Sequence, residues 1–516
     1  MDAANLTLAL LLFFFFFFLF FSKLITQNFA NFRNLPPSPL ALPIIGHLYL
    51  LKEPVHRTLH QLSEKHGHIL FLKFGARNVP VVSSPTAVEE CFTKNDIIFA
   101  NRPQLLAGKH LNYNYTTIGL SSYGDHWCNL RRLTTIELFS TSRLATFSGI
   151  REQEVRQLLK QLFQDSSTSS IRVKLGTRLV DISFNSMLRM IAGKRCYGKD
   201  VKDEEAKEFQ EIMREVVELH RNSNLGDFLP VLRWVDFQGV EKRMVKLMKK
   251  QDKFFQHLLD EHRTRTDSSI DLDKLDASNK EQKKQTLIDL LLSMQKTDAD
   301  FYTEKTIKGL ILALLVAGTE SSATTTEWAL SLLHNHPDAM HKAWVEINSH
   351  VGEDRLLDES DLPQLNYLQN VINETFRLFP PVPILLPHES SEDCTVGGFH
   401  VPGGTMLLAN LWTIHRDPKL WTDATKFMPE RFESEDGEGY HLIPFGVGRR
   451  ACPEAKLGRR VIGLTLGALI QSFELERIGE EDIDMMEGTG LCMPKAEPLE
   501  ALCKPRRAMI NLLSCL

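Results

Sequence analysis

The sequence lacks the cysteine patterns that hold metal ions or disulfide frameworks. Its 516 residues include 8 cysteines, but none forms a Cys-x-x-Cys pair and none lies in a cluster with zinc-ligand spacing. This usage suits a reducing compartment, and it means that a cysteine with a chemical role acts alone. The formal net charge of -5 gives no indication of nucleic-acid binding. The hydrophobic content of 43% allows a substantial buried core.

One long hydrophobic run is present, and it lies at the N-terminus. The run Leu6–Phe21 contains Thr7 as its only polar residue, and "LI" soon follows it, so it approaches the roughly 17–25 residues of a spanning helix. No positive segment precedes it and no A-x-A-like site follows, which disfavours a cleaved signal peptide. Basic residues follow the run and an acidic residue precedes it, so the positive-inside rule places the remaining chain in the cytosol. We expect an uncleaved membrane anchor at residues 1–24.

A proline-rich stretch follows the anchor. Leu35–His47, "LPPSPLALPIIGH", cannot be helix interior and favours an extended, semi-rigid spacer. We expect a stiff neck at residues 25–47 and one domain at residues 48–516. The polar segment Thr264–Gln285 reads as an exposed loop inside this domain.

The pattern of apolar residues predicts a mainly α domain with a minor β part. Two apolar-rich runs around "GARN", within Ile69–Ser84, indicate a hairpin, and short strands return near Thr395–Met406. Apolar residues at three- and four-residue steps predict further helices at Glu152–Phe163, Glu204–His220, Gly239–Arg263 and Glu281–Gln295.

The segment Thr306–His336 predicts one long helix with an unusual middle. Its apolar part before Gly318 is too short to span a bilayer, so we expect a buried core helix. The polar stretch "TESSATTT", Thr319–Thr326, is out of place in a core. Ser and Thr hydroxyls bond carbonyls three or four residues back and bend helices. The sequence therefore predicts a local opening and a polar groove within this helix.

Cys452 differs in setting from the other cysteines. It follows glycines and arginines in "PFGVGRRACPEAK", and a helix begins just after it, with Pro453 in a permitted first-turn position. A sulfur at a helix N-terminus near arginines is expected to have a lowered pKa and to exist as thiolate. A thiolate can attack a substrate or bind a metal. No histidine lies close in sequence to act as a base, and a metal with one thiolate and no companion ligands leaves haem.

The stretch Phe445–Cys452, "FGVGRRAC", resembles the haem-binding signature Phe-x-x-Gly-x-Arg-x-Cys of the cytochromes P-450, the haem-thiolate monooxygenases. Other stretches follow in the family's order along almost the whole chain. They are "WCNLR" with Trp127 and Arg131, "AGTESS" at Ala317–Ser322, "ETFR" with Glu374 and Arg377, and "PERF" with Arg431. With the anchor and neck, these resemble the microsomal plant branch, and "LLPHESSEDC" and "PFGVGRRACP" resemble its eighty-first family. The resemblance implies the cytochrome P-450 fold, preceded by a transmembrane helix.

The same resemblance implies a role for each residue. Cys452 would ligate the iron of haem b and favour O–O cleavage, while Glu320 and Ser321 would relay protons. Trp127, Arg131, His388, Phe445 and Arg450 would bind the haem, and Glu374, Arg377 and Arg431 would form a buried network behind it. The family usually has Thr where Ser321 stands, so we expect activity with looser coupling between oxygen use and product.

The resemblance also assigns the substrate pocket. We expect it to be lined by Leu111, Ala313, Ala317, Ile384 and Cys492, so a lipophilic small molecule fits. Related plant enzymes oxidise flavonoids, lignans, indoles and terpenoids. The expected function is insertion of one oxygen atom from O2 into a lipophilic plant metabolite. Electrons would come from NADPH through a reductase, and the catalytic domain would face the cytosol from the endoplasmic reticulum membrane.

Two other functions stay open at this point. One is a haem-thiolate isomerase or dehydratase that needs no reductase, and the intact "AGTESS" disfavours it. The other is a haem-binding scaffold, supported only by Glu454 where the family usually has Gly. We expect the Glu454 side chain to turn outward, toward Lys456 or Arg450, because a buried unpaired carboxylate is costly. The cations Arg449, Arg450, Lys456, Arg459 and Arg460 read either as a docking face for an acidic reductase or as a solvated charge run.

Overall fold

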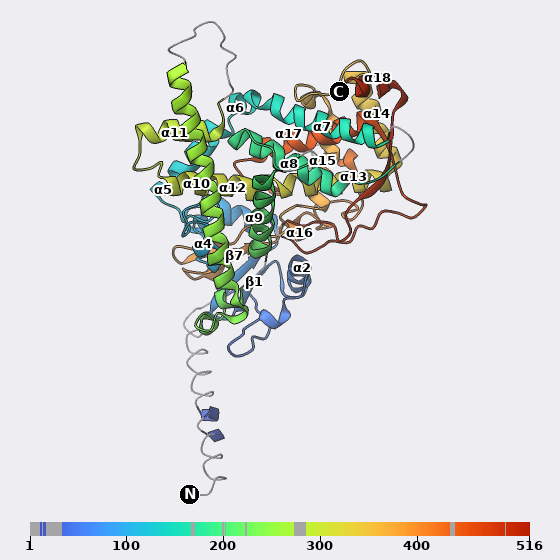
Figure 1. Cartoon of the computed structure of the whole chain (residues 1–516). Coiled ribbons are helices and arrows are strands. Elements are labelled where there is room, and N and C mark those ends of the chain that lie inside the picture. The colour runs from blue at the N-terminus through green and yellow to red at the C-terminus, as the bar shows by residue number, and fades with distance from the viewer. Residues whose placement is uncertain are drawn as a thin grey trace.

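The body of the protein is a helical assembly with small sheets (Figure 1). This computed structural model describes residues 11–12, 14–16, 34–166, 171–198, 201, 203–221, 224–272, 285–433, 439–490 and 492–516. Its longer helices are α2 (Val55–His66), α3 (Pro85–Phe92), α5 (Asp125–Leu133), α7 (Ser148–Ser166), α8 (Leu175–Ala192), α9 (Glu204–Arg221), α10 (Val240–Leu272), α11 (Leu287–Thr297), α12 (Glu304–Gly318), α13 (Glu320–Asn335), α14 (Pro337–Val351), α15 (Asn366–Leu378) and α17 (Ala455–Ser472). The expectation of a mainly α domain with a minor β part is confirmed.

The sheets gather segments that are distant in sequence. A four-stranded sheet has the order β1 (Ile69–Phe74), β2 (Arg77–Val82), β7 (Met406–Ala409) and β4 (His388–Glu389). A three-stranded sheet joins β3 (Ile171–Lys174), β9 (Glu500–Pro505) and β8 (Phe473–Glu476), and β5 (Cys394–Val396) pairs with β6 (Phe399–Val401). The β1–β2 hairpin confirms the prediction from "GARN".

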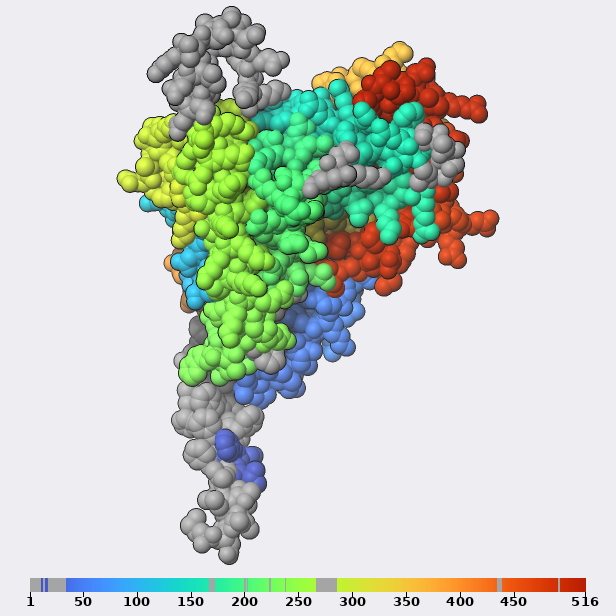
Figure 2. Space-filling model, viewed as in Figure 1, coloured from blue at the N-terminus to red at the C-terminus, as the bar shows by residue number. Residues whose placement is uncertain are grey.

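Helix α13 lies at the centre of the body, against α8, α15 and α17. Trp328 of α13 is fully buried, and its ring stacks on Phe379 with centroids 4.0 Å apart. Helices α9 and α10 cover much of one face, and the N-terminal part of the body lies at the lower end of that face (Figure 2). The core therefore surrounds the helix in which the sequence predicts an opening.

Two helix boundaries differ most from the predictions. Helix α11 begins at Leu287 rather than Glu281, because Thr286 and Asp289 form a capping box that starts the helix there. Helix α10 continues to Leu272, into the segment predicted as a loop. The polar composition of this segment predicted a loop, but a helix whose earlier turns are packed can extend into solvent at little cost. Residues 273–284 of the expected loop lie outside the described residues.

The structure describes only part of the predicted anchor and neck. Most of the expected anchor, residues 1–24, lies outside the described residues; Leu11, Leu12 and Phe14–Phe16 are helical and exposed. The described part of the neck is not a free spacer, because the Phe71 amide donates to the Pro37 carbonyl (2.9 Å) along the edge of β1. Among the described residues, the segment Glu304–Asn335 is long and apolar enough to cross a membrane, but 67% of its apolar 18-residue window is buried inside the body. It is a core element, as predicted.

Candidate functional site

The long core helix is interrupted at its polar stretch. Helix α12 ends at Gly318 and α13 begins at Glu320, with Thr319 between them at φ -104 and ψ -64. The Thr319 hydroxyl donates to the Leu315 carbonyl (2.7 Å), and the Ser321 hydroxyl donates to the Ala317 carbonyl (2.9 Å). These side chains replace or share backbone bonds at the break. The predicted local opening is therefore present.

One face of the interrupted helix is less buried than the rest. Ala317 is exposed and Ala313 and Ser321 are half-buried, although most of their helical neighbours are buried. The three residues are spaced four apart, which places them on one face of the helix. Cys452 is also exposed, in the loop that precedes α17, the helix packed against α13. A small-residue face of the core helix and a thiol are thus accessible in an otherwise dense fold.

The loop that carries Cys452 is held by its neighbours. The Cys452 amide donates to the Phe445 carbonyl (2.8 Å), and Arg131 of α5 donates to the Ala451 carbonyl (2.5 Å). The Phe445 ring contacts Phe376 edge-to-face, with centroids 5.1 Å apart. Phe445 thus acts in this structure as a brace for the cysteine loop.

The protein groups around Cys452 do not by themselves lower its pKa, contrary to the expectation from the helix N-terminus and the arginines. Burial, and then the negative charge of Glu454, raise the pKa of Cys452 to about 12. The hydrogen bond from the Glu454 amide and the charge of Arg131 lower this pKa, but by less. A metal ion coordinated by a thiol deprotonates it, so a bound haem iron would favour the thiolate.

Several cations lie beside this loop without a carboxylate partner. Arg102 is buried and donates to the carbonyls of Leu386 (2.7 Å) and Pro387 (2.8 Å), and Arg450 donates to those of Ala100 (2.7 Å) and Ser121 (2.6 Å). Burial lowers the pKa of Arg102 to about 9 and that of Arg450 to about 10.

Among the described residues, Arg102, Arg131 and Arg450 form no ion pair, so these three cations are a candidate anion site. Their chemistry fits the two carboxylates of a haem, whose iron Cys452 would hold. Sequence reasoning missed Arg102; the available signal was an arginine set between the apolar pairs Phe99–Ala100 and Leu105–Leu106.

His388 lies in the same place and is buried. Its Nδ1 is 2.7 Å from the Phe99 carbonyl, and burial, together with the charge of Arg102, holds its pKa well below the usual range. The neutral ring has Nε2 left for a further partner. His388 is therefore not a surface histidine.

Trp127 is buried beside Arg450. Its indole N–H donates to the Ile118 carbonyl (3.1 Å). The Arg450 guanidinium lies over the ring, 4.3 Å from its centroid. Trp127 therefore helps to position Arg450, and its expected role in binding the haem stays a prediction.

Glu374, Arg377 and Arg431 form a buried network. The Nε and Nη2 atoms of Arg377 donate to Glu374 at 2.7 and 2.8 Å, and the Nε of Arg431 donates to the same carboxylate at 3.1 Å. All three residues are at most 8% exposed. An ordinary exposed helical pair is thereby excluded.

Glu454 does not turn outward, contrary to our expectation. It is 8% exposed, and its Oε2 is buried without a hydrogen-bond partner. The carboxylate lies against Gly318 and is directed away from Lys456 and Arg450, into the junction of α17 with α12. Burial raises its pKa to about 8. The departure from the family's glycine therefore faces the protein interior.

The expected cluster of free cations is largely absent. Arg450 points inward, Arg459 lies over the rings of Phe376 and Phe445, and only Lys456 is exposed without such a contact. The partners of the others are Asp96 for Arg449 (3.2 Å), Asn373 for Arg459 (2.8 Å) and Glu359 for Arg460 (3.2 Å). Acids, an amide and ring faces that are distant in sequence contact these cations, so they are not a free solvated charge run. The docking face for a reductase stays a prediction.

The remaining predicted residues differ in how deeply they are buried. Burial raises the pKa of Glu320, against the opposing charge of Arg221, and the charge of Glu320 in turn acts on buried Cys492. Ile384 is half-buried. Leu111 is 0% exposed and belongs to a hydrophobic cluster with α10, so it is not a lining residue in this structure.

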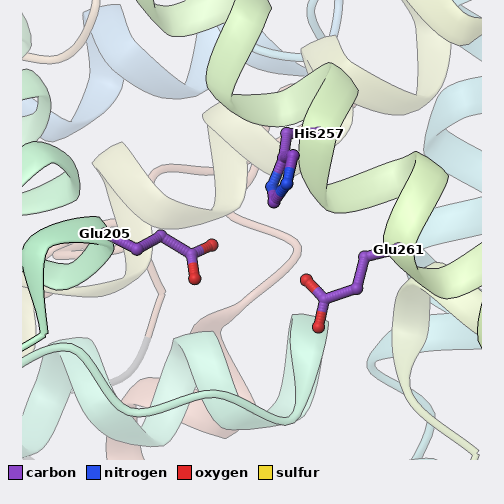
Figure 3. A group of neighbouring side chains, drawn as sticks. All are labelled: Glu205, His257 and Glu261. Carbon is purple, nitrogen blue, oxygen red and sulfur yellow. The ribbon is translucent and has the colours of Figure 1, made fainter.

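Another group of potential metal ligands lies between α9 and α10. Glu205, His257 and Glu261 converge on one space (Figure 3), with their ligand atoms within 4.8 Å of one another. The ammonium of Lys194 pairs with Glu205 (2.8 Å) and with Glu261 (2.6 Å). A protein cation thus already compensates both acids, and the group carries no metal assignment.

Comparisons with known proteins agree with this geometry. The family model for cytochrome P-450 matches residues 36–500. Cytochrome P-450 81Q32 of Catharanthus roseus is 52% identical over 93% of this chain and 94% of its own length. Isoflavone 2'-hydroxylase of Glycyrrhiza echinata is 49% identical over 92% and 93%. A zebra fish cytochrome P-450 solved with progesterone has a TM-score of 0.74 at 26% identity, covering 88% of this chain and 100% of that chain. The chain belongs to the cytochrome P-450 family of monooxygenases, and the relatives it resembles include members of the plant eighty-first family.

Proposed function

We propose that this monooxygenase hydroxylates, or similarly oxidises, a lipophilic plant specialised metabolite. The observation that carries the proposal is the small-residue face of Ala313, Ala317 and Ser321, which is accessible within the core helix, as Cys452 is in its loop. Relatives support the substrate class: two are named as an isoflavone 2'-hydroxylase and as a (+)-piperitol/(+)-sesamin synthase. The two alanines of this face favour an apolar molecule.

Haem, when bound, supplies the activation of O2. Cys452 would hold the iron, and Arg102, Arg131, Arg450 and His388 would hold the carboxylates. The residues of the helix break would manage protons. Glu320, whose pKa burial raises, can take up a proton more readily than an exposed carboxylate, and the Ser321 hydroxyl, bonded to the Ala317 carbonyl, can pass one onward.

Electrons would come from NADPH through a reductase. The need for such a partner separates a monooxygenase from a haem-thiolate isomerase or dehydratase, which turns over without NADPH. Lys456 is the exposed cation of the α17 N-terminus. The docking surface therefore needs cations from other elements, or contacts that are not electrostatic.

Membrane anchoring is part of the same proposal. Besides the N-terminal run, large apolar side chains are exposed around the β1–β2 turn. The neck meets this turn through the Gly75 amide and the Ile45 carbonyl (3.1 Å), and the Ala76 amide donates to the Phe228 carbonyl (2.8 Å). The exposed apolar side chains on the neck and on the segment that follows Phe228 are Leu40 (79%), Ile44 (67%), Val231 (64%), Trp234 (91%) and Val235 (75%). A face of this kind favours contact with lipid.

We propose the endoplasmic reticulum membrane as the location, with the catalytic body in the cytosol. Deletion of residues 2–23 is expected to reduce binding to vesicles, and Trp234→Ser with Val235→Ser is expected to reduce the remainder. Val345→Ser on α14, another exposed apolar position, serves as the control. Unchanged vesicle binding of the deleted protein would contradict the anchor.

The haem-thiolate assignment has a direct test. The reduced, carbon monoxide-bound protein should show the far red-shifted Soret band of a thiolate-ligated haem, and Cys452→Ala should abolish it. Cys515→Ala removes another exposed thiol and should leave the band intact. Product formation from a flavonoid panel should require NADPH and reductase. Turnover without NADPH would favour the isomerase alternative, and a thiolate-type band in Cys452→Ala would overturn the ligand assignment.

A further inference from the structure

A hollow of about 440 Å³ lies where the ends of α13 and α15 meet the segment Thr425–Met428. None of the residues assigned above to haem or substrate lines it. Its walls are mostly apolar and include Leu332, Phe379, Phe427 and Met485. Its volume is typical of pockets for small molecules.

Arg416 lines the same hollow. Its guanidinium lies over the ring of Trp412 at 4.3 Å and over that of Phe379 at 5.5 Å from the centroids. Its Nη1 is buried without a hydrogen-bond partner, and no carboxylate within the described ranges forms an ion pair with it. A guanidinium carries five N–H donors, and a buried Nη1 without an acceptor lacks an expected partner.

The charges around Arg416 leave it uncompensated. The two acids that act on it, Glu487 and Glu374, are already bound by other cations: Arg57 holds Glu487 at 2.9 Å and Arg377 holds Glu374 at 2.7 Å. Burial, with the positive charge of Arg377 opposing that of Glu487, lowers the pKa of Arg416 to about 9. An anion entering this region would therefore meet a net positive environment.

The wall of the hollow is held in place by the buried network. Arg377 donates to the carbonyls of Ala424 (2.6 Å) and Lys426 (3.1 Å), and the Met428 amide donates to Glu374 (2.9 Å). These bonds fix both ends of the Thr425–Met428 wall. The hollow is therefore preformed, which lowers the entropic cost of binding.

We propose that this hollow binds an amphipathic carboxylate, with its carboxylate on Arg416 and its apolar body along the walls. The acids and cations around Arg416 already pair with each other, so one positive charge is left uncompensated. That single charge matches a ligand with one negative charge. The apolar walls favour an alkyl or aromatic body over an inorganic anion, which would stay better hydrated in water. Met485 precedes the chain segment that carries Cys492, so a bound ligand would contact the chain that leads into the substrate region.

Decanoate, with decanol as its uncharged match, tests the proposal on the full-length, haem-loaded protein. Equilibrium dialysis measures total binding, while the haem absorption spectrum reports molecules that enter the haem pocket. We expect a decanoate site that leaves the spectrum unchanged. Arg416→Met should weaken it about tenfold or more, because a charge-assisted hydrogen bond is lost, and decanol should bind about as weakly.

Matched variants keep the test decisive. Lys426→Met removes an exposed cation from the same rim and should bind decanoate as the wild type does. Met485→Trp fills the hollow but retains the guanidinium, and should lose the site even where Arg416→Met folds poorly. Spectrally silent binding that survives Met485→Trp, or decanol binding equal to that of decanoate, would overturn the proposal. Equally strong competition by inorganic phosphate would show a bare anion site and would overturn the amphipathic ligand.

Discussion

A Cβ atom on Gly318 would lie 2.4 Å from Oε2 of Glu454. The same atom would lie 2.3 Å from Cε of Met187 in α8, so the end of α12 and the start of α17 meet with no space to spare. Glu454 thus fills, from the haem-thiolate side, the room beside the helix break that the family's usual glycine leaves open. This contact limits which substitutions either position tolerates.

Gly318→Ala is expected to destabilise the protein by about 1–3 kcal/mol, because overpacking forces buried side chains to shift. Without this clash, alanine would stabilise the helix relative to glycine. In the Glu454→Gly background the clash with Oε2 is removed and only that with Met187 remains, so the same substitution should destabilise the protein less. A thermal-unfolding double-mutant cycle measures this coupling. Additive effects would show that Glu454 does not occupy this space, and a large rise in haem content in Glu454→Gly alone would show that Glu454 impairs the cofactor site.

Arg102→Met should lower the haem content strongly, because it removes a buried cation from the anion site and three bonds to backbone carbonyls. Arg102→Lys keeps the charge but not the planar fork, so it should retain part of the haem. Arg132→Met, at an exposed arginine of α5, is the control. The ratio of haem to protein is measured for each. Full haem content in Arg102→Met would exclude it from the site.

Ser321→Ala should lower the amount of product formed per NADPH consumed, because the hydroxyl at the helix break is lost. Ser321→Thr keeps the hydroxyl and adds the methyl that the family usually has, so its coupling should equal or exceed that of the wild type. Product, NADPH consumption and released hydrogen peroxide are measured together. Equal coupling in all three proteins would remove Ser321 from the proton path.

Glu487→Gln should destabilise the protein by roughly 2–3 kcal/mol at pH 7. Burial alone would raise the pKa of Glu487, but bonds from His56 and Arg57 outweigh it and lower the pKa to about 2. A lowered folded-state pKa contributes stability above the unfolded value of about 4.5, and this stability is lost as the pH falls toward 2. Denaturation of the wild type and the variant should therefore converge between pH 4.5 and 2. Glu481→Gln, at an exposed acid, should show no such convergence, and a pH-independent difference in Glu487→Gln would contradict the pairing.

Local patterns predicted most elements correctly. The hairpin at Ile69–Val82 and the helices α7, α9 and α12–α13 follow from side-chain periodicity, which depends only on neighbours in the chain. The break at Thr319 follows from hydroxyls that bond to carbonyls four residues back. Boundaries were less accurate, because the cap at Thr286 and the extension of α10 depend on context.

The site was predictable where residue type alone limits the chemistry. A lone cysteine beside arginines and glycines leaves few roles, and Cys452, with the residues of the family motifs, was named from the sequence. Orientation was less predictable. Glu454 turns inward, Trp127 gives its N–H to a carbonyl, and Leu111 lies in the core, because each direction depends on neighbours from distant segments.

The sequence by itself determined the order of elements, the interrupted core helix and the cysteine proposed as the haem ligand, since these rest on contacts a few residues long. Tertiary structure alone decided which charges are compensated. Asp96, Asn373 and Glu359 engage the arginines around α17, whereas Arg102 and Arg416 are left without an acid among the described residues. Charges act through space over several ångströms and through burial, so their pairing is known only once segments hundreds of residues apart have packed together.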